Sequence, residues 1–113
     1  MEYRKLGRTG LQLPVIGFGA GQFGDMYGDT SQENCDRTAA MAIEAGINYF
    51  DVAPSYGPEG LAETRLGIAL KPHDRSKLIV NTKVAAGITA WWDLPFTSTV
   101  SNRRRSARNW KTA

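Results

Sequence analysis

Three short runs of apolar residues stand out along the chain, at residues 15–19, 47–52 and 78–84. Each run is nearly continuous in apolar side chains, which is typical of parallel strands that are covered on both faces. The runs therefore predict three strands of one sheet, the first of them short and buried.

The segments between these runs have the features of helices. Thr30-Ser31-Gln32-Glu33 matches a capping box, so a helix is expected to begin at Thr30. Gly46 is placed to end that helix in the left-handed conformation. A second helix is expected at residues 61–70, because Pro72 disfavours helix at the residue before it. This order of elements predicts a right-handed parallel βαβαβ unit.

Two further segments precede the first helix. Residues 1–13 alternate loosely around Gly7-Arg8-Thr9-Gly10, which predicts a β-hairpin. Residues 20–29 are rich in Gly and Asp and have no helical periodicity, so a loop is expected there.

Polar side chains stand at the carboxyl ends of the second and third strands. Asp51 ends the second strand, Tyr56 follows it in a Pro/Ser/Gly turn, and Lys83 lies at the end of the third. Strand side chains alternate between faces and neighbouring strands lie about 4.8 Å apart, so Asp51 and Lys83 are expected within reach of a salt bridge. Tyr56 can fold back over both. Active sites of parallel α/β sheets are built at this edge.

These three side chains suit proton transfer. A phenol is a weak acid at neutral pH, but a nearby ammonium stabilises the phenolate. We interpret Tyr56 as the proton donor, Lys83 as its activating cation, and Asp51 as the group that holds Lys83 and positions a polar ligand group. Proton donation to a carbonyl complements hydride delivery from a nicotinamide cofactor. Taken singly, each residue also fits a structural role, as a turn cap, a packed ring or a solvated strand end.

The same residues belong to a longer resemblance to the aldo/keto reductases. It covers residues 1 to about 84 and rests on seven matched segments: Leu6-Gly7-Arg8-Thr9-Gly10-Leu11, Val15-Ile16-Gly17-Phe18-Gly19, Gly46-Ile47-Asn48-Tyr49-Phe50-Asp51, Tyr56-Gly57, Glu63, Leu66-Gly67 and Thr82-Lys83. The chain is most similar to the branch that includes plant-type galactose dehydrogenase and related aldose dehydrogenases.

The resemblance implies a (β/α)8 TIM barrel with a plugging hairpin. It also implies an oxidoreductase that interconverts an aldehyde, ketone or aldose and an alcohol or lactone, using NADP(H) or in some members NAD(H). The family's catalytic Asp, Tyr and Lys correspond to Asp51, Tyr56 and Lys83. Glu63 matches a position that we interpret as stabilising the second helix through its dipole. The expected cofactor contacts are Gly19, Ala20 and Gly21, whose backbone resembles the segment that approaches the nicotinamide, together with Asp51.

Chain length limits how much of a barrel can form. At 113 residues the chain is far shorter than the roughly 250 residues of a closed barrel, so we expect an incomplete one. The family's fourth catalytic residue, a histidine after the next strand, is absent, and His73 lies at the opposite edge. With no signal sequence or membrane span, a cytoplasmic protein without membrane contact is expected. Cys35, the single cysteine, is expected to be buried and no metal site is expected.

The sequence changes character after Val84. Residues 1–93 carry a net charge of −2, whereas residues 94–113 carry five basic side chains and no acid. Residues 97–113 offer too few large apolar side chains to cover a sheet. We interpret residues 1–84 as a partial barrel domain and residues 85–113 as a non-homologous basic tail from a frameshifted or misjoined reading frame. A disordered terminus is one alternative, and nonspecific contact with nucleic acid or another acidic surface is the least favoured.

Two other functions compete with an active reductase. The glycines of Gly19-Ala20-Gly21-Gln22-Phe23-Gly24 fit the Rossmann fingerprint, but that fold needs a helix opening at the second glycine, not at Thr30. A non-enzymatic remnant is the more serious alternative, because five strands and most of a cofactor pocket are missing. We expect a reductase by ancestry, for a small carbonyl or sugar substrate, whose isolated chain is inactive and can self-associate.

Overall fold

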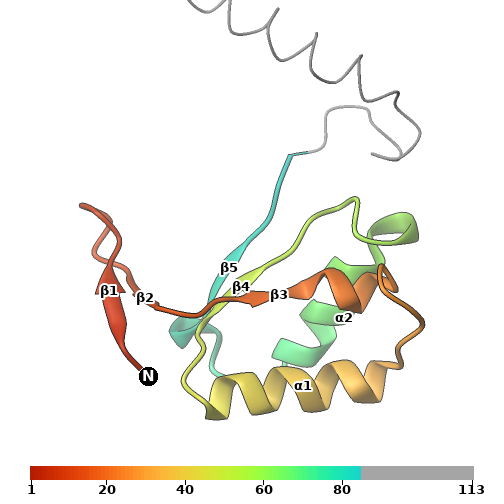
Figure 1. The fold of residues 1–113 in the computed structure, drawn as a ribbon, viewed down its shortest axis with the longest axis horizontal. Coiled ribbons are helices and arrows are strands. Elements are labelled where there is room, and N and C mark those ends of the chain that lie inside the picture. Colours follow the sequence, from red (N-terminus) through yellow and green to blue (C-terminus); the bar gives the residue numbers. More distant parts are fainter. Residues whose placement is uncertain (85–113) are drawn as a thin grey trace, which may run out of the picture.

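The computed structural model describes residues 1–84, which form a hairpin followed by a parallel sheet with two α-helices (Figure 1). β1 (Tyr3–Lys5) and β2 (Gln12–Pro14) pair antiparallel. β3 (Phe18–Gly19), β4 (Tyr49–Asp51) and β5 (Ile79–Asn81) are parallel and adjacent in that order. The predicted hairpin and parallel sheet are confirmed, although each strand is shorter than expected. All predictions for residues 85–113 lie outside the described part of the chain.

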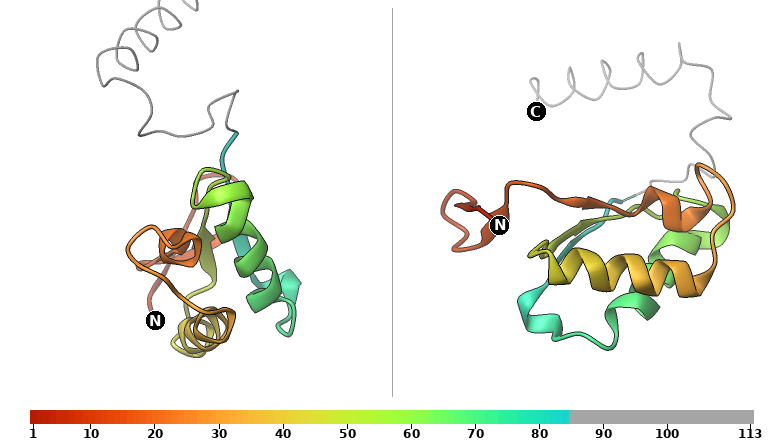
Figure 2. Two further views of the ribbon diagram at one scale, coloured as in Figure 1. Left: turned by 90° about the vertical axis from the view of Figure 1, so that its right-hand side faces the viewer. Right: turned by 60° about the horizontal axis from the view of Figure 1, so that its bottom comes forward.

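The two α-helices lie beside each other along one side of the parallel sheet (Figure 2). They are α1 (Gln32–Glu44) and α2 (Leu61–Leu70), and the second has the predicted bounds. The core between sheet and helices centres on Phe50 of β4, which is fully buried together with Leu66 and Cys35. The ring of Phe18 lies 5.4 Å from that of Phe50. Burial of Cys35 is therefore confirmed, and that burial raises the pKa of its thiol.

The hairpin lies at the amino-terminal edge of the parallel sheet. The Tyr3 hydroxyl donates to the carbonyl of Gly46 at 2.5 Å, and the Asn48 side-chain amide donates to the carbonyl of Gln12 at 3.3 Å. Gly46 and Asn48 immediately precede β4, so these contacts place the hairpin at the start of the strands. The carboxyl edge, where the candidate site lies, is at the other end (Figure 1).

The first parallel strand was predicted too long and too buried. Only Phe18–Gly19 pairs with β4, while Val15 and Ile16 are 50% and 59% exposed. The backbone amide of Val15 donates to the carbonyl of Glu2 at 3.0 Å. This bond extends the hairpin, so the apolar run is divided between the two sheets.

The segment expected to be a loop contains a helical turn. Residues Ala20–Gly24 form a 3-10 helix, η1, which ends at Asp25 with a φ of 59°. The predicted loop is wrong there, because five residues are too few to show helical periodicity.

The capping residue of helix α1 lies one position later than predicted, and the helix itself begins at Gln32. The backbone amide of Thr30 donates to the Asp25 carboxylate at 2.9 Å, so Thr30 is held by the preceding turn. Ser31 is the cap instead, and its hydroxyl accepts from the amide of Asn34 at 3.1 Å. Gly46 follows the helix with a φ of 92°, which confirms the predicted left-handed stop.

Short 3-10 helices complete the described part. η2 (Pro58–Gly60) leads into α2, and η3 (Arg75–Lys77) leads into β5. Among residues 1–84, no helix has the length and apolar character needed to cross a bilayer.

Candidate active site

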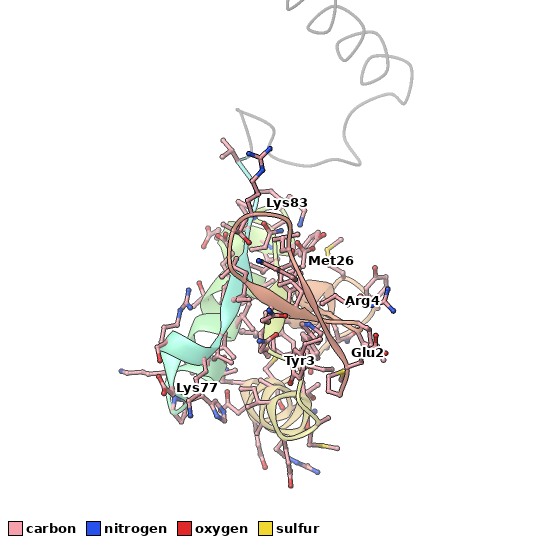
Figure 3. The ribbon with its side chains drawn as sticks, turned by 90° about the vertical axis from the view of Figure 1, so that its left-hand side faces the viewer. Glu2, Tyr3, Arg4, Met26, Lys77 and Lys83 are labelled. Atoms are coloured by element: carbon pink, nitrogen blue, oxygen red, sulfur yellow. The ribbon has the colours of Figure 1, made fainter. Side chains whose placement is uncertain are left out.

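The Asp51 carboxylate is held on both of its oxygens at the carboxyl edge of the sheet. Asp51 pairs in register with Asn81 of β5, whose side-chain amide donates to Oδ1 at 2.5 Å. Lys83 lies two residues beyond Asn81, and its Nζ lies 2.9 Å from Oδ2 of Asp51. Lys83 also donates to the carbonyl of Val52 at 3.1 Å. The predicted salt bridge between Asp51 and Lys83 is present, and Figure 3 shows Lys83 far from Lys77, which lies before the start of β5.

Tyr56 completes the predicted group. It lies in the loop between β4 and η2, and the Lys83 ammonium lies 5.1 Å from the centroid of its ring. This distance is within the range of a cation–π contact. The structure therefore brings Asp51 and Lys83 together, as strand parity predicts, and places the Tyr56 ring beside Lys83. The chemical roles of the three residues stay predictions.

The electrostatics favour an ionised Asp51–Lys83 pair. The hydrogen bond from Lys83, supported by that from Asn81, holds the pKa of Asp51 below its usual value despite partial burial. For Lys83, burial acts to lower the pKa, but the bond and charge of Asp51, with Tyr56, outweigh burial and raise it. The two side chains are 34% and 45% exposed. Exposed pairs contribute only about 0.2–1 kcal/mol to stability, so stability alone does not account for this arrangement.

The backbone at Tyr56 is fixed by close packing against η1. A Cβ added at Gly24 would overlap the carbonyl group of Tyr56, and one added at Gly57 would overlap the backbone of Gly24. Gly57 also has a φ of 83°, a conformation that favours glycine. The carbonyl of Tyr56 accepts from the amide of Ala62 in α2 at 3.1 Å. Tyr56 is thus held between η1 and α2.

Arg65 of α2 binds to the carboxyl end of η1. Its guanidinium donates to the carbonyl of Phe23 at 3.0 Å and to the Asp25 carboxylate at 2.7 Å. Its side chain is 19% exposed, so much of this contact is shielded from water. The role of Arg65 was not predicted from the sequence, and neither was the contact between Gly24 and Gly57. The glycine directly after Tyr56 was the one sequence feature that pointed to this contact.

Glu63 links α2 to the end of β5. It lies in the first turn of α2, where a carboxylate is favoured by the helix dipole. Its Oε1 also accepts a hydrogen bond from the Thr82 hydroxyl at 2.6 Å, a contact that sequence analysis missed. Thr82 directly precedes Lys83, so this bond helps to fix the segment that carries the ammonium.

A groove of about 440 Å³ lies between α2 and β5, and Glu63 and Thr82 are among the residues that line it. Its lining includes Val52, Leu66, Val80 and Thr82. Because Val52 alternates with Asp51 along the chain, this groove is on the side of the sheet that faces the helices. The groove therefore lies on the opposite face of the sheet from the Asp51 side chain.

The predicted cofactor segment lies beside Asp51. Gly19 pairs in register with Asp51, and the space that a Cβ would occupy at Gly19 is open. Ala20 is fully buried, so its side chain cannot meet a ligand. At Gly21 an added Cβ would lie 3.5 Å from the Tyr27 ring. An exposed backbone next to a carboxylate fits a polar ligand, and the cofactor contacts themselves stay predictions.

The Rossmann alternative does not fit this geometry. The segment that carries the glycine pattern forms η1, and α1 begins only at Gln32. Gly24, the last glycine of the pattern, packs on the Tyr56 loop.

His73 lies in the turn after α2, where its amide donates to the carbonyl of Leu70 at 3.0 Å. Within residues 1–84 no group of three His, Cys, Asp or Glu side chains is arranged to hold a metal ion.

Residues 15–110 match the model of the aldo/keto reductase family. The chain belongs to this family. The match continues past Val84, where the sequence analysis ends the resemblance, and the origin of residues 85–113 stays a prediction.

Individual aldo/keto reductases agree with this assignment. The chain is 41% identical over 85 residues to L-galactose dehydrogenase of Arabidopsis thaliana. The aligned residues make up 74% of this chain and 26% of that enzyme. The chain is 39% identical over 75 residues to D-threo-aldose 1-dehydrogenase of a Pseudomonas species, covering 66% of the chain and 22% of that enzyme. These matches support the predicted galactose dehydrogenase branch.

A solved aldo-keto reductase from Bacillus halodurans, in its holo form, superimposes with a TM-score of 0.65. It is 34% identical, and the match covers 81% of this chain and 30% of that one. The hairpin and parallel sheet therefore correspond to part of an aldo/keto reductase. The chain spans about a quarter of the length of the two dehydrogenases.

Proposed function

We propose that residues 1–84 supply three catalytic groups of an NAD(P)(H)-dependent oxidoreductase that interconverts an aldose or another small carbonyl compound and its alcohol or lactone. The observation that carries this proposal is the position of the Lys83 ammonium, 2.9 Å from Asp51 and 5.1 Å from the centre of the Tyr56 ring. Family membership supports the same chemistry.

Tyr56 is the proposed general acid and base. In the reducing direction its hydroxyl donates a proton to the substrate carbonyl oxygen, and in the oxidising direction its phenolate removes the proton from the substrate hydroxyl. The adjacent Lys83 ammonium stabilises the phenolate by charge. Asp51 keeps Lys83 in place through the hydrogen bond to Oδ2.

A nicotinamide cofactor, when bound, supplies or accepts the hydride, which is chemistry that side chains lack. The open backbone at Gly19 and the Asp51 carboxylate beside it are the groups of this chain that we propose to hold its reactive end. Ala20 shapes the same segment from within the core, and Gly21 continues it.

The substrate class comes from the relatives. The names of the two dehydrogenases assign them L-galactose and D-threo-aldoses, so we propose an aldose as the first substrate to test. In the oxidising direction the product of a cyclic aldose is a lactone, because the anomeric hydroxyl becomes the carbonyl.

A chimera tests this function most directly. Residues 1–84 replace the aligned segment of the Arabidopsis enzyme, which supplies the remaining parts of a barrel. We expect reduction of NAD+ or NADP+, followed at 340 nm, when L-galactose or a D-threo-aldose is added. A folded chimera with no turnover on any aldose or small aldehyde would contradict the proposal and would favour a non-enzymatic remnant.

A further inference from the structure

Asn81 is the one neighbour of Asp51 in β5 to which no role has been assigned. It stands within a run of apolar residues, and asparagine is depleted in strands. Its side chain is exposed, so water could satisfy the amide equally well. The amide is nonetheless directed at Oδ1 of Asp51, at 2.5 Å.

We propose that Asn81 is a positioning residue: its amide fixes the plane of the Asp51 carboxylate, so that the second oxygen holds Lys83 next to Tyr56. The meaning of this arrangement for catalysis rests on the proposed function. The arrangement itself is a property of the chain and can be measured without turnover.

The two oxygens of the Asp51 carboxylate have different partners, Asn81 at Oδ1 and Lys83 at Oδ2. A carboxyl group on a short side chain rotates over a broad range of χ2, and lysine is a flexible point charge with rotatable donors. Without a second contact, Lys83 can bind either oxygen of Asp51 and move with it. Asn81 occupies Oδ1, which leaves Oδ2 for Lys83, while the carbonyl of Val52 gives the ammonium a second acceptor at 3.1 Å.

The neutrality of the amide matters as much as its position. A second cation at residue 81 would compete with Lys83 for Asp51 and would repel the ammonium. An amide donates to the carboxylate without adding charge, so Lys83 remains the cation closest to Asp51 and keeps its contact with the Tyr56 ring. Within residues 1–84, the charged or titratable groups that contact Asp51 and Lys83 are each other and Tyr56.

The test is a pH titration of the 113-residue chain by NMR, with 13C-labelled Asp carboxyl groups and 15N-labelled Lys side chains. In Asn81→Ala we expect the pKa of Asp51 to rise toward its usual value, since one of the bonds that lower it is lost. We also expect the Lys83 ammonium signal to broaden or shift. Asn34→Ala removes the same side chain from the surface of α1 and should leave both signals unchanged.

Two further variants distinguish a positioning role of Asn81 from a general loss of folding. Asn81→Asp has nearly the same size but replaces the donor by an acceptor that repels Asp51, so the pKa of Asp51 should rise further than in Asn81→Ala. Asn81→Ser keeps a donor and should recover part of the effect. If Asp51 and Lys83 titrate in all three variants as in the original chain, Asn81 has no positioning role and the proposal is overturned. Because no step depends on activity, failure of the chimera to turn over an aldose would leave this result intact.

Discussion

Gly24 and Tyr56 lie in direct backbone contact, so close that a methyl group at Gly24 would overlap the Tyr56 carbonyl. Gly24 ends η1, and Tyr56 carries the proposed proton donor. The contact couples the segment after β3 to the loop after β4, and it explains why a glycine is needed at this position.

The first prediction concerns that contact. In the chimera, Gly24→Ala should lower the free energy of unfolding by about 1–3 kcal/mol, as overpacking does, and should reduce turnover by displacing Tyr56. Gly67→Ala is the matched control, because an added Cβ there meets nothing within 4 Å. Because Gly67 lies in the interior of α2, Gly67→Ala should raise the free energy of unfolding by about 0.5–1 kcal/mol. Urea unfolding and kcat measure both effects, and equal stability of the two variants would contradict the packing argument.

The second prediction concerns acid. Hydrogen bonds from the Thr30 amide and from Arg65 hold the pKa of Asp25 below the ordinary value of 3.8. The folded chain therefore binds fewer protons here than the unfolded chain does. Stability from this group is present above pH 3.8 and is lost as the pH falls through the lower, folded value.

Asp25→Asn tests the acid effect without backbone strain. Asn tolerates the positive φ of Asp25 but cannot pair with Arg65 as an anion. In thermal melts at neutral pH, the chimera with Asp25 should unfold at a higher temperature than its Asp25→Asn variant. This difference in stability should vanish at low pH. A difference that is constant from pH 7 to 2 would exclude the ion pair as its cause.

The third prediction concerns the 113-residue chain by itself. Within residues 1–84, β3 and β5 each pair on one edge only, and an unpaired edge invites association. We expect the chain to elute from size-exclusion chromatography as an oligomer or as a partly unfolded chain, with weak cofactor binding and no measurable carbonyl reduction. A compact monomer that binds NADPH at micromolar concentration would show that this chain is a functional unit.

Sequence patterns predicted the parts of the structure that depend on local rules. Strand parity placed Asp51 and Lys83 on one face at one edge, and proline at residue 72 located the end of α2. Two of the errors came from contacts that periodicity does not reveal. The amide of Val15 bonds to Glu2 instead of joining the parallel sheet, and the hydroxyl that caps α1 belongs to Ser31, while the backbone amide of Thr30 bonds to Asp25.

The sequence predicted the main side chains of the candidate site but not the residues that position them. The three principal side chains follow from strand ends and from the family resemblance. The residues that hold them do not, since the Thr82–Glu63 bond and the Asn81–Asp51 bond depend on the register of β4 and β5 and on the place of α2. Periodicity gives the face of a side chain but not its partner.

Replacement of Tyr56 by phenylalanine in the chimera is the measurement that tests the central claim. Tyr56→Phe removes only the hydroxyl, and loss of a general acid and base should lower kcat at least about 10²-fold. Tyr3→Phe is the control, because it removes a hydroxyl that binds Gly46 at the opposite edge of the sheet. We expect that control to retain turnover close to the original. Turnover in Tyr56→Phe equal to that in Tyr3→Phe would contradict the assignment of Tyr56 as the proton donor.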